Sequence, residues 1–227
     1  MNVDTNFVGK MSEISVRVVA HMGSDLTVVN AARVSFGKTV SEMSEKDTKL
    51  IRYLAKHNHW SPFGHCSVQF HIKAPVFVAR QLVKHQIGLT WNEISRRYVD
   101  TEVEFYDVDK WRGRAENKKQ GSNEEIDIQF VDRNTRTAHL QLDVERTAKE
   151  NYNRMLDAGI APEQARMILP QSMMTEWYWS GTLYAFARIC NLRCALDAQY
   201  ETRIVANLIN KECKELFPIS WKELRNI

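Results

Sequence analysis

Residues 67–85 read SVQFHIKAPVFVARQLVKH, and this stretch is the most informative about the fold. Val68, Phe70 and Ile72 alternate with polar residues, which is the period of a strand with one buried face. Pro75 stands where a first-turn proline belongs, and the residues after it continue as a helix to His85. The stretch therefore predicts a strand that is followed at once by a helix.

The residues N-terminal to this stretch supply one more strand and one more helix. Val16, Val18 and Ala20 alternate with polar neighbours, which predicts a strand near the start of the chain. Residues 44–47 (SEKD) resemble a capping box, and the apolar residues at 50–55 that follow have helical spacing.

The residues C-terminal to it are predicted to be largely helical. A long helix presents one stripe formed by Leu140, Val144, Ala148, Tyr152 and Met155. Gly159 is a plausible end for that helix, and a short helix runs from Pro162 to Ile168. We expect the remainder to be mostly helical.

These elements predict the α+β class, because a few strands occur with helices and without βαβα alternation. We expect a single domain over residues 1–227, with a central, mostly antiparallel sheet flanked by helices and a helical C-terminal half. Residues 107–127 are polar and charged, which predicts an exposed excursion.

Composition excludes several classes of protein. The chain has 227 residues, of which 44% are hydrophobic and 26% charged, as is typical of globular proteins. No apolar run approaches the length of a membrane span, and a formal net charge of +3 does not indicate a nucleic-acid partner. The four cysteines form no CxxC pair, which favours a reducing, cytoplasmic setting.

Residues 57–71 hold His57, His59, His65, Cys66 and His71, all of them possible zinc ligands. Their spacing matches no common zinc motif, and the segment contains no acidic residue to serve as a base. We therefore expect no metal site, and interpret some of these imidazoles as lining a pocket. A metal-dependent hydrolase remains an alternative.

Two further segments concentrate arginine. Residues 79–100 combine Arg80, Lys84, Arg96 and Arg97 with polar side chains, which suits phosphate or carboxylate recognition but is also typical of a solvated face. Residues 165–203 interleave four arginines with six aromatic residues. Buried arginines need an anionic partner, which is either a ligand or an internal carboxylate such as Asp197 or Glu201.

Five blocks in this order resemble the flavin-dependent thymidylate synthases, between about Asn30 and Ile209. The blocks are HWSPFGH (59–65), KAPVFVARQ (73–81), NEISRRY (92–98), ARMILP (165–170) and, from residue 191, NLR followed by AQYE. The chain departs from the family where the Arg-His-Arg motif becomes Lys84-His85-Gln86, with one residue inserted between Gly88 and Trp91. Other departures are Gly64 in place of Glu, and Thr182, Tyr184 and Arg188 at flavin-contacting positions.

The resemblance implies an enzyme that converts dUMP to dTMP. Its implied cofactor is FAD, with methylenetetrahydrofolate as one-carbon donor and NADPH as reductant. It also implies a homotetramer with shared active sites. Arg193 matches the catalytic residue that stabilises the activated uracil, and no cysteine nucleophile is expected. The implied dUMP contacts are Gln81, Lys84, Glu93, Ser95, Arg96, Arg97, Arg166 and Arg193. The implied FAD or folate contacts are His59, Ser61, Lys84, His85, Gln86, Glu93 and Arg188. A non-catalytic nucleotide- or RNA-binding module is the alternative.

Overall fold

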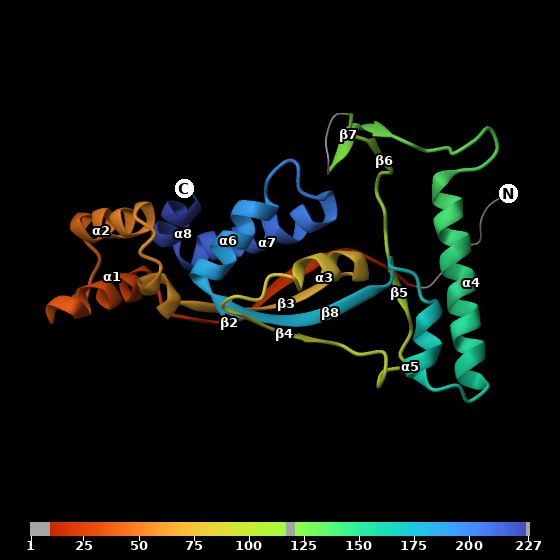
Figure 1. Ribbon diagram of the computed structural model, residues 1–227, viewed down its shortest axis with the longest axis horizontal. Coiled ribbons are helices and arrows are strands. Elements are labelled where there is room, and N and C mark those ends of the chain that lie inside the picture. Colours follow the sequence, from red (N-terminus) through yellow and green to blue (C-terminus); the bar gives the residue numbers. More distant parts are fainter. Residues whose placement is uncertain (1–9, 117–120, 226–227) are drawn as a thin grey trace. The chain divides into compact units, whose positions relative to one another are not determined.

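The computed structural model describes residues 10–116 and 121–225 (Figure 1). The chain divides into two compact units, each assembled from separate stretches of sequence. The first unit contains Met1–Ile14, Lys73–Leu82 and Glu93–Glu176. The second contains Ser15–Ile72, Val83–Asn92 and Trp177–Ile227.

The first unit is built around a long helix and two small sheets. Its elements are β1 (Lys10–Ser12), α3 (Val76–Leu82), β5 (Glu104–Tyr106), β6 (Arg112–Arg114), β7 (Ser122–Asp127), α4 (Thr137–Asp157), α5 (Pro162–Ala165) and a 3-10 turn (Arg166–Ile168). Strands β1 and β5 pair in parallel, and β6 and β7 pair antiparallel. Val103, Phe105, Tyr152 and Ala165 form its buried cluster.

Helix α4 has the predicted position but not the predicted burial. Its buried residues are Glu145, Ala148 and Tyr152. Leu140 and Val144 are 45% and 57% exposed, so the expected apolar stripe faces the core only in its C-terminal half. Gly159 follows the helix end with a φ of +83°, in the left-handed region that favours glycine.

The polar segment 107–127 is partly ordered as the β6–β7 ribbon. Gly113 lies in β6 and is buried. The Ile126 side chain packs directly over it, since a Cβ atom on Gly113 would lie only 2.8 Å from that side chain. Most other described side chains of the segment are exposed or half-buried.

The second unit carries most of the helices. Its elements are β2 (Ser15–Met22), α1 (Asp25–Arg33), α2 (Glu45–Lys56), α6 (Leu183–Arg193), α7 (Tyr200–Leu216) and α8 (Pro218–Arg225), with 3-10 turns at Val34–Phe36 and Ser61–His65. The capping box before α2 is confirmed, since Ser44 Oγ accepts from the Asp47 backbone N–H at 3.4 Å.

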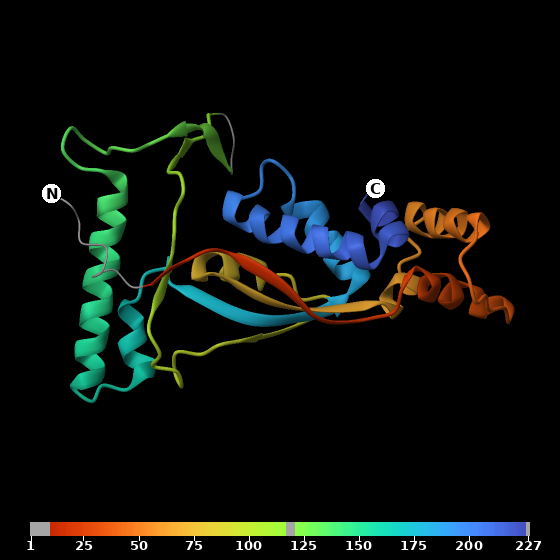
Figure 2. The same cartoon turned by 180° about the vertical axis from the view of Figure 1, so that it is seen from behind.

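A four-stranded sheet has the order β2-β3-β8-β4 (Figure 2). Strand β3 (Ser67–Pro75) alternates between half-buried and buried residues as predicted. Strands β4 (Leu89–Glu93) and β8 (Met174–Thr182) run antiparallel, since Gly88 O accepts from Thr182 N and Glu176 O accepts from Ile94 N. The α+β class is therefore confirmed.

The prediction of a mostly helical C-terminal half is wrong for residues 174–182. This segment is β8, where Met174, Thr175, Trp177 and Trp179 are buried on a central strand. Aromatic residues and threonine favour a pleated, half-buried surface, and here that preference prevails. The helix after Pro75 is also shorter than expected: α3 (Val76–Leu82) ends three residues before His85, where the predicted helix ended.

Side-chain packing fixes the sheet against α6 within the second unit. Phe186 on α6 meets Phe70 and Trp179 edge-on, with ring centroids 5.0 and 5.4 Å apart. Trp91 stacks on Trp177 at 4.3 Å. Such pairs add stability beyond the area they bury, so the first turns of α6 are held rigidly on the sheet.

Candidate active site

A pocket of about 610 Å³ opens in the first unit where α3, β4, β8 and the Arg166–Ile168 turn converge. Its charged and polar lining residues are Lys73, Arg80, Glu93, Arg96, Glu102, Glu104, Glu163, Arg166, Gln171, Thr175 and Glu176. Three predicted dUMP residues therefore meet here: Glu93, Arg96 and Arg166.

Most cations of this pocket already have a protein partner. Lys73 Nζ forms an ion pair with Glu104. Arg96 donates to the backbone carbonyls of Thr101 and Glu102, and Arg166 Nε donates to the Glu163 carbonyl at 3.3 Å. Carbonyl partners orient a guanidinium without neutralising it, so both arginines keep their charge for an anionic ligand.

The remaining dUMP candidates of this unit lie near the pocket in sequence but outside its lining. Arg97 Nε donates to Ser95 Oγ at 3.3 Å, and its guanidinium lies 4.9 Å from the centre of the Tyr98 ring. Gln81 Oε1 is buried without a hydrogen-bond donor. A buried acceptor without a partner is costly, so Gln81 fits a ligand-contacting role.

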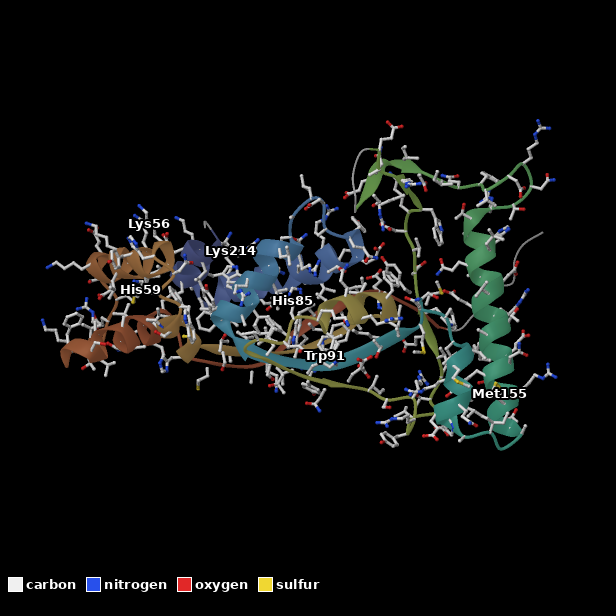
Figure 3. The ribbon with its side chains drawn as sticks, in the orientation of Figure 1. Lys56, His59, His85, Trp91, Met155 and Lys214 are labelled. Atoms are coloured by element: carbon white, nitrogen blue, oxygen red, sulfur yellow. The ribbon has the colours of Figure 1, made fainter. Side chains whose placement is uncertain are left out.

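A second cluster forms in the other unit between α6 and the segment before β4. Arg193 Nε donates to His85 Nε2 at 3.1 Å. Because Nε2 accepts, the proton of the neutral imidazole lies on Nδ1. Figure 3 labels His85 among the side chains of this unit.

Burial lowers the pKa of His85, and the positive charges of Arg193 and Arg188 lower it further. Within the described residues, neither arginine forms an ion pair with a carboxylate, including Asp197. The cluster therefore presents two guanidinium groups and a neutral imidazole without an internal anion. Its electrostatics favour a negatively charged ligand.

The other predicted flavin or folate residues of this unit are solvent-accessible. His59, Ser61, Lys84, Gln86 and Arg188 are all exposed. The His59 ring lies 5.9 Å from that of Tyr53 and 6.4 Å from that of His57. The structure thus groups His85, Arg188 and Arg193 and leaves the other four as separate candidates.

Trp60 and Tyr184 form an aromatic pair that the sequence reasoning did not assign. Their ring centroids are 6.3 Å apart with an interplanar angle of 40°, and Trp60 is 58% exposed. A Cβ atom on Gly64 would make an ordinary van der Waals contact with the Trp60 ring at 3.5 Å, so Gly64 lies directly beside this ring. The signal was present in the Gly64 and Tyr184 departures from the family pattern.

The segment before β4, where the sequence comparison predicts an inserted residue, turns at Gly88, whose φ is +76°. Gly88 O accepts from the Thr182 backbone N–H at 3.2 Å. A Cβ atom on Gly88 would meet Ala185 at 3.3 Å. This segment therefore packs on the N-terminal turn of α6.

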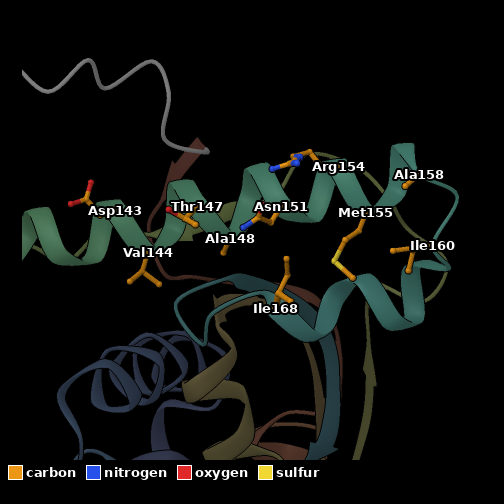
Figure 4. Close-up of a pocket in the computed structure, with 10 residues that line it drawn as sticks. All are labelled: Asp143, Val144, Thr147, Ala148, Asn151, Arg154, Met155, Ala158, Ile160 and Ile168. Carbon is orange, nitrogen blue, oxygen red and sulfur yellow. The ribbon is translucent and has the colours of Figure 1, made fainter.

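Another hollow, of about 850 Å³, lies in the first unit along α4 (Figure 4). Met155 and Ile168 line it together with Val144 and Ile160, and it contains none of the predicted site residues. The first pocket also contains Arg80, which the sequence placed among the possible anion-binding residues of 79–100, and Thr175, which the sequence did not single out.

The histidines of residues 57–71 do not gather as ligands. Over the described ranges, no group of three His, Cys, Asp or Glu side chains is placed to hold a metal ion. His71 instead packs against Tyr178, with ring centroids 5.2 Å apart.

Comparison with known proteins assigns the family. The thymidylate synthase complementing protein family model matches residues 17–219. A flavin-dependent thymidylate synthase of Thermus thermophilus is 39% identical over 206 residues, covering 91% of this chain and 73% of its own. That of Kosmotoga olearia is 38% identical over 211 residues, covering 93% and 90%. The chain belongs to the flavin-dependent thymidylate synthase family.

A solved structure with a similar fold supports the comparison. The UMP/dUMP methylase PolB from Streptomyces cacaoi, bound with 5-Br dUMP, has a TM-score of 0.80 and 30% sequence identity. The alignment covers 97% of this chain and 98% of PolB. The resemblance seen in the five sequence blocks and the prediction of a methyltransferase are therefore confirmed.

None of the helices in the described part of this family member is both long and apolar enough to cross a membrane.

Proposed function

We propose that this enzyme converts dUMP to dTMP with FAD as cofactor, methylenetetrahydrofolate as one-carbon donor and NADPH as reductant. The observation that carries the proposal is the His85–Arg188–Arg193 cluster, which holds uncompensated positive charge in a member of this family. A family enzyme that activates uracil without a thiol needs such a group, because negative charge develops on the pyrimidine.

The proposed role of Arg193 is to stabilise the uracil anion that forms when N3 loses its proton. A guanidinium held in place before the reaction stabilises developing charge without reorganising. His85 supplies this positioning, because its Nε2 accepts from Arg193 Nε at 3.1 Å. Keeping His85 neutral matters, since an imidazolium has no lone pair for this contact.

The nucleotide is proposed to contact the polar pocket of the first unit. Arg166 and Arg96 are oriented by carbonyl groups and suit the phosphate. Glu93 Oε1 accepts from Thr175 Oγ1 at 2.7 Å, which fixes the carboxylate for a polar contact with the ligand. Ser95, Arg97, Gln81 and Lys84 remain proposed dUMP contacts.

The residues of the second unit fit a flavin dinucleotide by the chemistry of their donors. Arg188, His85, Lys84 and Gln86 offer positive or polar groups for its phosphates, and His59 and Ser61 are further predicted contacts of this unit. Glu93, which belongs to the first unit, remains a separate predicted contact. The exposed Trp60 ring offers a face for a planar ring system. A bound flavin would supply the hydride-transfer chemistry of the reaction.

We further propose a homotetramer with shared active sites, in the cytoplasm and as one domain over residues 1–227. The four free thiols, of which Cys66, Cys190 and Cys213 are buried, support a reducing compartment.

The test is the visible spectrum of the purified protein with added FAD, followed by dTMP formation. We expect flavin absorbance that survives gel filtration, bleaching by NADPH, and dTMP that depends on dUMP and methylenetetrahydrofolate. UMP serves as a parallel substrate, because the PolB structures contain 5-Br derivatives of both UMP and dUMP. Folded protein that binds no FAD and retains RNA would instead support the nucleotide-binding module.

A further inference from the structure

Two cysteines lie one helical turn apart at the end of α6, directly beside Arg193. Cys190 is buried within the helix, and Cys194 is the half-buried residue that caps it. The Cys194 backbone N–H donates to the Cys190 carbonyl at 3.0 Å, so the helical geometry extends through both. Residues four apart occupy the same face of a helix, which brings the two thiols together.

The environment of the pair makes one thiol acidic and the other not. A hydrogen bond from the Cys190 thiol and the nearby Arg225 guanidinium lower the pKa of Cys194 to about 7. Burial raises the pKa of Cys190, which therefore keeps its proton. The Cys190 thiol also lies 3.5 Å from the Ala206 carbonyl, but a thiolate is the stronger acceptor for its single proton.

Hydrogen bonds to two asparagines hold the Arg225 guanidinium near Cys194, where its charge lowers the pKa of that thiol. Its Nε donates to Asn210 Oδ1 at 3.1 Å, and its Nη1 donates to Asn191 Oδ1. Within the described ranges Arg225 has no carboxylate partner. Its charge therefore remains available to a thiolate at Cys194. Low thiol pKa, partial exposure and an adjacent second thiol are the properties of redox-sensitive cysteines.

We propose that Cys194 and Cys190 form a peroxide-sensitive pair whose oxidation displaces Arg193. In the first step, the Cys194 thiolate attacks a hydroperoxide oxygen, so that an S–O bond forms, the O–O bond breaks and hydroxide or alkoxide leaves. In the second, the Cys190 sulfur displaces the hydroxyl of the resulting sulfenic acid as its proton is lost. A disulfide and water form, and a thiol reductant reverses the sequence.

The disulfide needs a change of backbone, which is why it would affect the site. Cβ atoms four residues apart on a helix are about 5–6 Å apart, whereas a disulfide requires about 3.5–4.5 Å. The last turn must therefore shift by on the order of 1 Å. Arg193 lies inside this turn, so its 3.1 Å contact with His85 is lost.

The experiment uses the full-length protein, reduced and then treated with one to a few equivalents of hydrogen peroxide at neutral pH. Trypsin cuts after Arg188, Arg193 and Arg203, which places the two cysteines on separate peptides, 189–193 and 194–203. After alkylation of the remaining thiols, we expect these two peptides to be joined in non-reducing digests and separated by dithiothreitol.

Variants assign the two steps. Cys190→Ala should stop at a sulfenic acid on Cys194, which dimedone captures, and Cys194→Ser should abolish both products. Cys66→Ser is the matched control, because burial raises the pKa of Cys66 to about 11. In the wild type, alkylation of Cys194 should be at least ~100-fold faster than that of Cys66 and should rise through pH 7.

Equal reactivity of Cys194 and Cys66, or peroxide treatment that yields no joined peptide, would overturn the proposal. The wild-type peptide map decides this even where a variant fails to fold. It is also independent of FAD binding, so the proposed function can fail while the thiol pair stands. In active enzyme, dTMP formation should fall at least ~10-fold on oxidation and recover with dithiothreitol, whereas Cys194→Ser should keep its activity in peroxide.

Discussion

The polar pocket of the first unit and the His85–Arg188–Arg193 cluster of the second handle positive charge in opposite ways. In the pocket, four cationic side chains share the lining with five glutamates, and Lys73 is paired with Glu104. In the cluster, two arginines flank an imidazole, with no ion pair to a carboxylate among the described residues. The first arrangement is stable without a ligand, whereas the second retains mutual repulsion.

This difference indicates which site responds more strongly to an anion. A pocket whose cations share the lining with carboxylates can select a ligand by shape and hydrogen bonds. An uncompensated cluster gains electrostatic stabilisation when negative charge arrives or develops. We therefore expect substitutions in the cluster to affect turnover and substitutions in the pocket to affect substrate binding.

The largest expected effect follows Arg193→Ala. Loss of one preorganised charge-stabilising group typically costs on the order of 10²–10³ in rate. We expect kcat for dTMP formation to fall by that factor, with a smaller change in FAD retention. Arg193→Lys should recover part of the rate, since a point charge cannot reproduce the planar donor fork.

Thermal unfolding of the same Arg193→Ala preparation separates catalysis from scaffolding. If the thermal midpoint falls while activity per folded molecule is unchanged, Arg193 is a structural residue. The expectation that the cluster controls turnover would then be wrong. Asp197→Ala is the matched control, because Asp197 is an exposed carboxylate that forms no ion pair with Arg193.

Arg166→Ala tests the pocket. The charge-assisted contact it offers to a phosphate is worth about 1.5–3 kcal/mol, so KM for dUMP should rise about 10- to 100-fold, with a smaller change in kcat. Arg154→Ala removes an exposed arginine of the same unit that lines the α4 hollow and should leave KM unchanged. A fall in kcat with unchanged KM would assign Arg166 to the chemistry and reverse our comparison.

Asp25→Ala tests stability in the second unit without touching either site. Asp25 accepts from the backbone N–H groups of Ile219 and Ser220 at 3.0 and 2.7 Å, at the start of α8. Leaving these donors without a partner should cost about 1–3 kcal/mol, which lowers Tm by about 2–4 °C per kcal/mol. Calorimetry measures the shift, and unchanged kcat per folded molecule is expected. An unchanged Tm would show that water replaces the carboxylate.

The smallest effect is a pH dependence caused by His85. Its folded pKa lies below the ordinary value of 6.5, so the unfolded chain binds more protons between those two values. Stability should therefore fall as pH drops below 6.5 and level off below the folded pKa. Urea titrations of wild type and His85→Gln from about pH 5 to 8 measure this, and Gln should flatten the slope in that window.

The pKa of His85 should also change when an anionic ligand binds. An anion placed between Arg188 and Arg193 offsets the charges that depress the His85 pKa, so bound FAD or dUMP should raise it. NMR titration of the imidazole ring protons follows the change. A pKa that stays constant on saturation would show that neither ligand approaches the cluster.

The sequence was most informative where local periodicity decides structure. The alternation in 67–72 and the SEKD box both describe the observed β3 and α2, because each depends on neighbours in the chain. The helix predicted for residues 174–182 was wrong, because the strands that pair with this segment, β3 and β4, are distant in sequence. The predicted buried face of α4 was partly wrong for the same reason. Contacts with residues distant in sequence bury the face that carries Glu145.

For the sites, the motif blocks supplied residue identities but not their grouping. The blocks predicted His85 and Arg193 separately, and only the fold brings their side chains within 3.1 Å. The Trp60–Tyr184 pair, the Cys190–Cys194 environment and the unpartnered Gln81 Oε1 depend on packing and burial, which no spacing rule describes.

The turn at Gly88 has a consequence for protein engineering. The Gly88 carbonyl lies 2.8 Å from where a Cβ atom on Gly181 would stand, and a Leu89 methyl group would lie even closer. This conformation of the loop is therefore compatible only with glycine at position 181. A chimera that grafts residues 84–95 onto a relative with a larger side chain at that position should misfold unless Gly181 is transferred with it. Residues 84–95 and Gly181 of β8 must therefore be exchanged together.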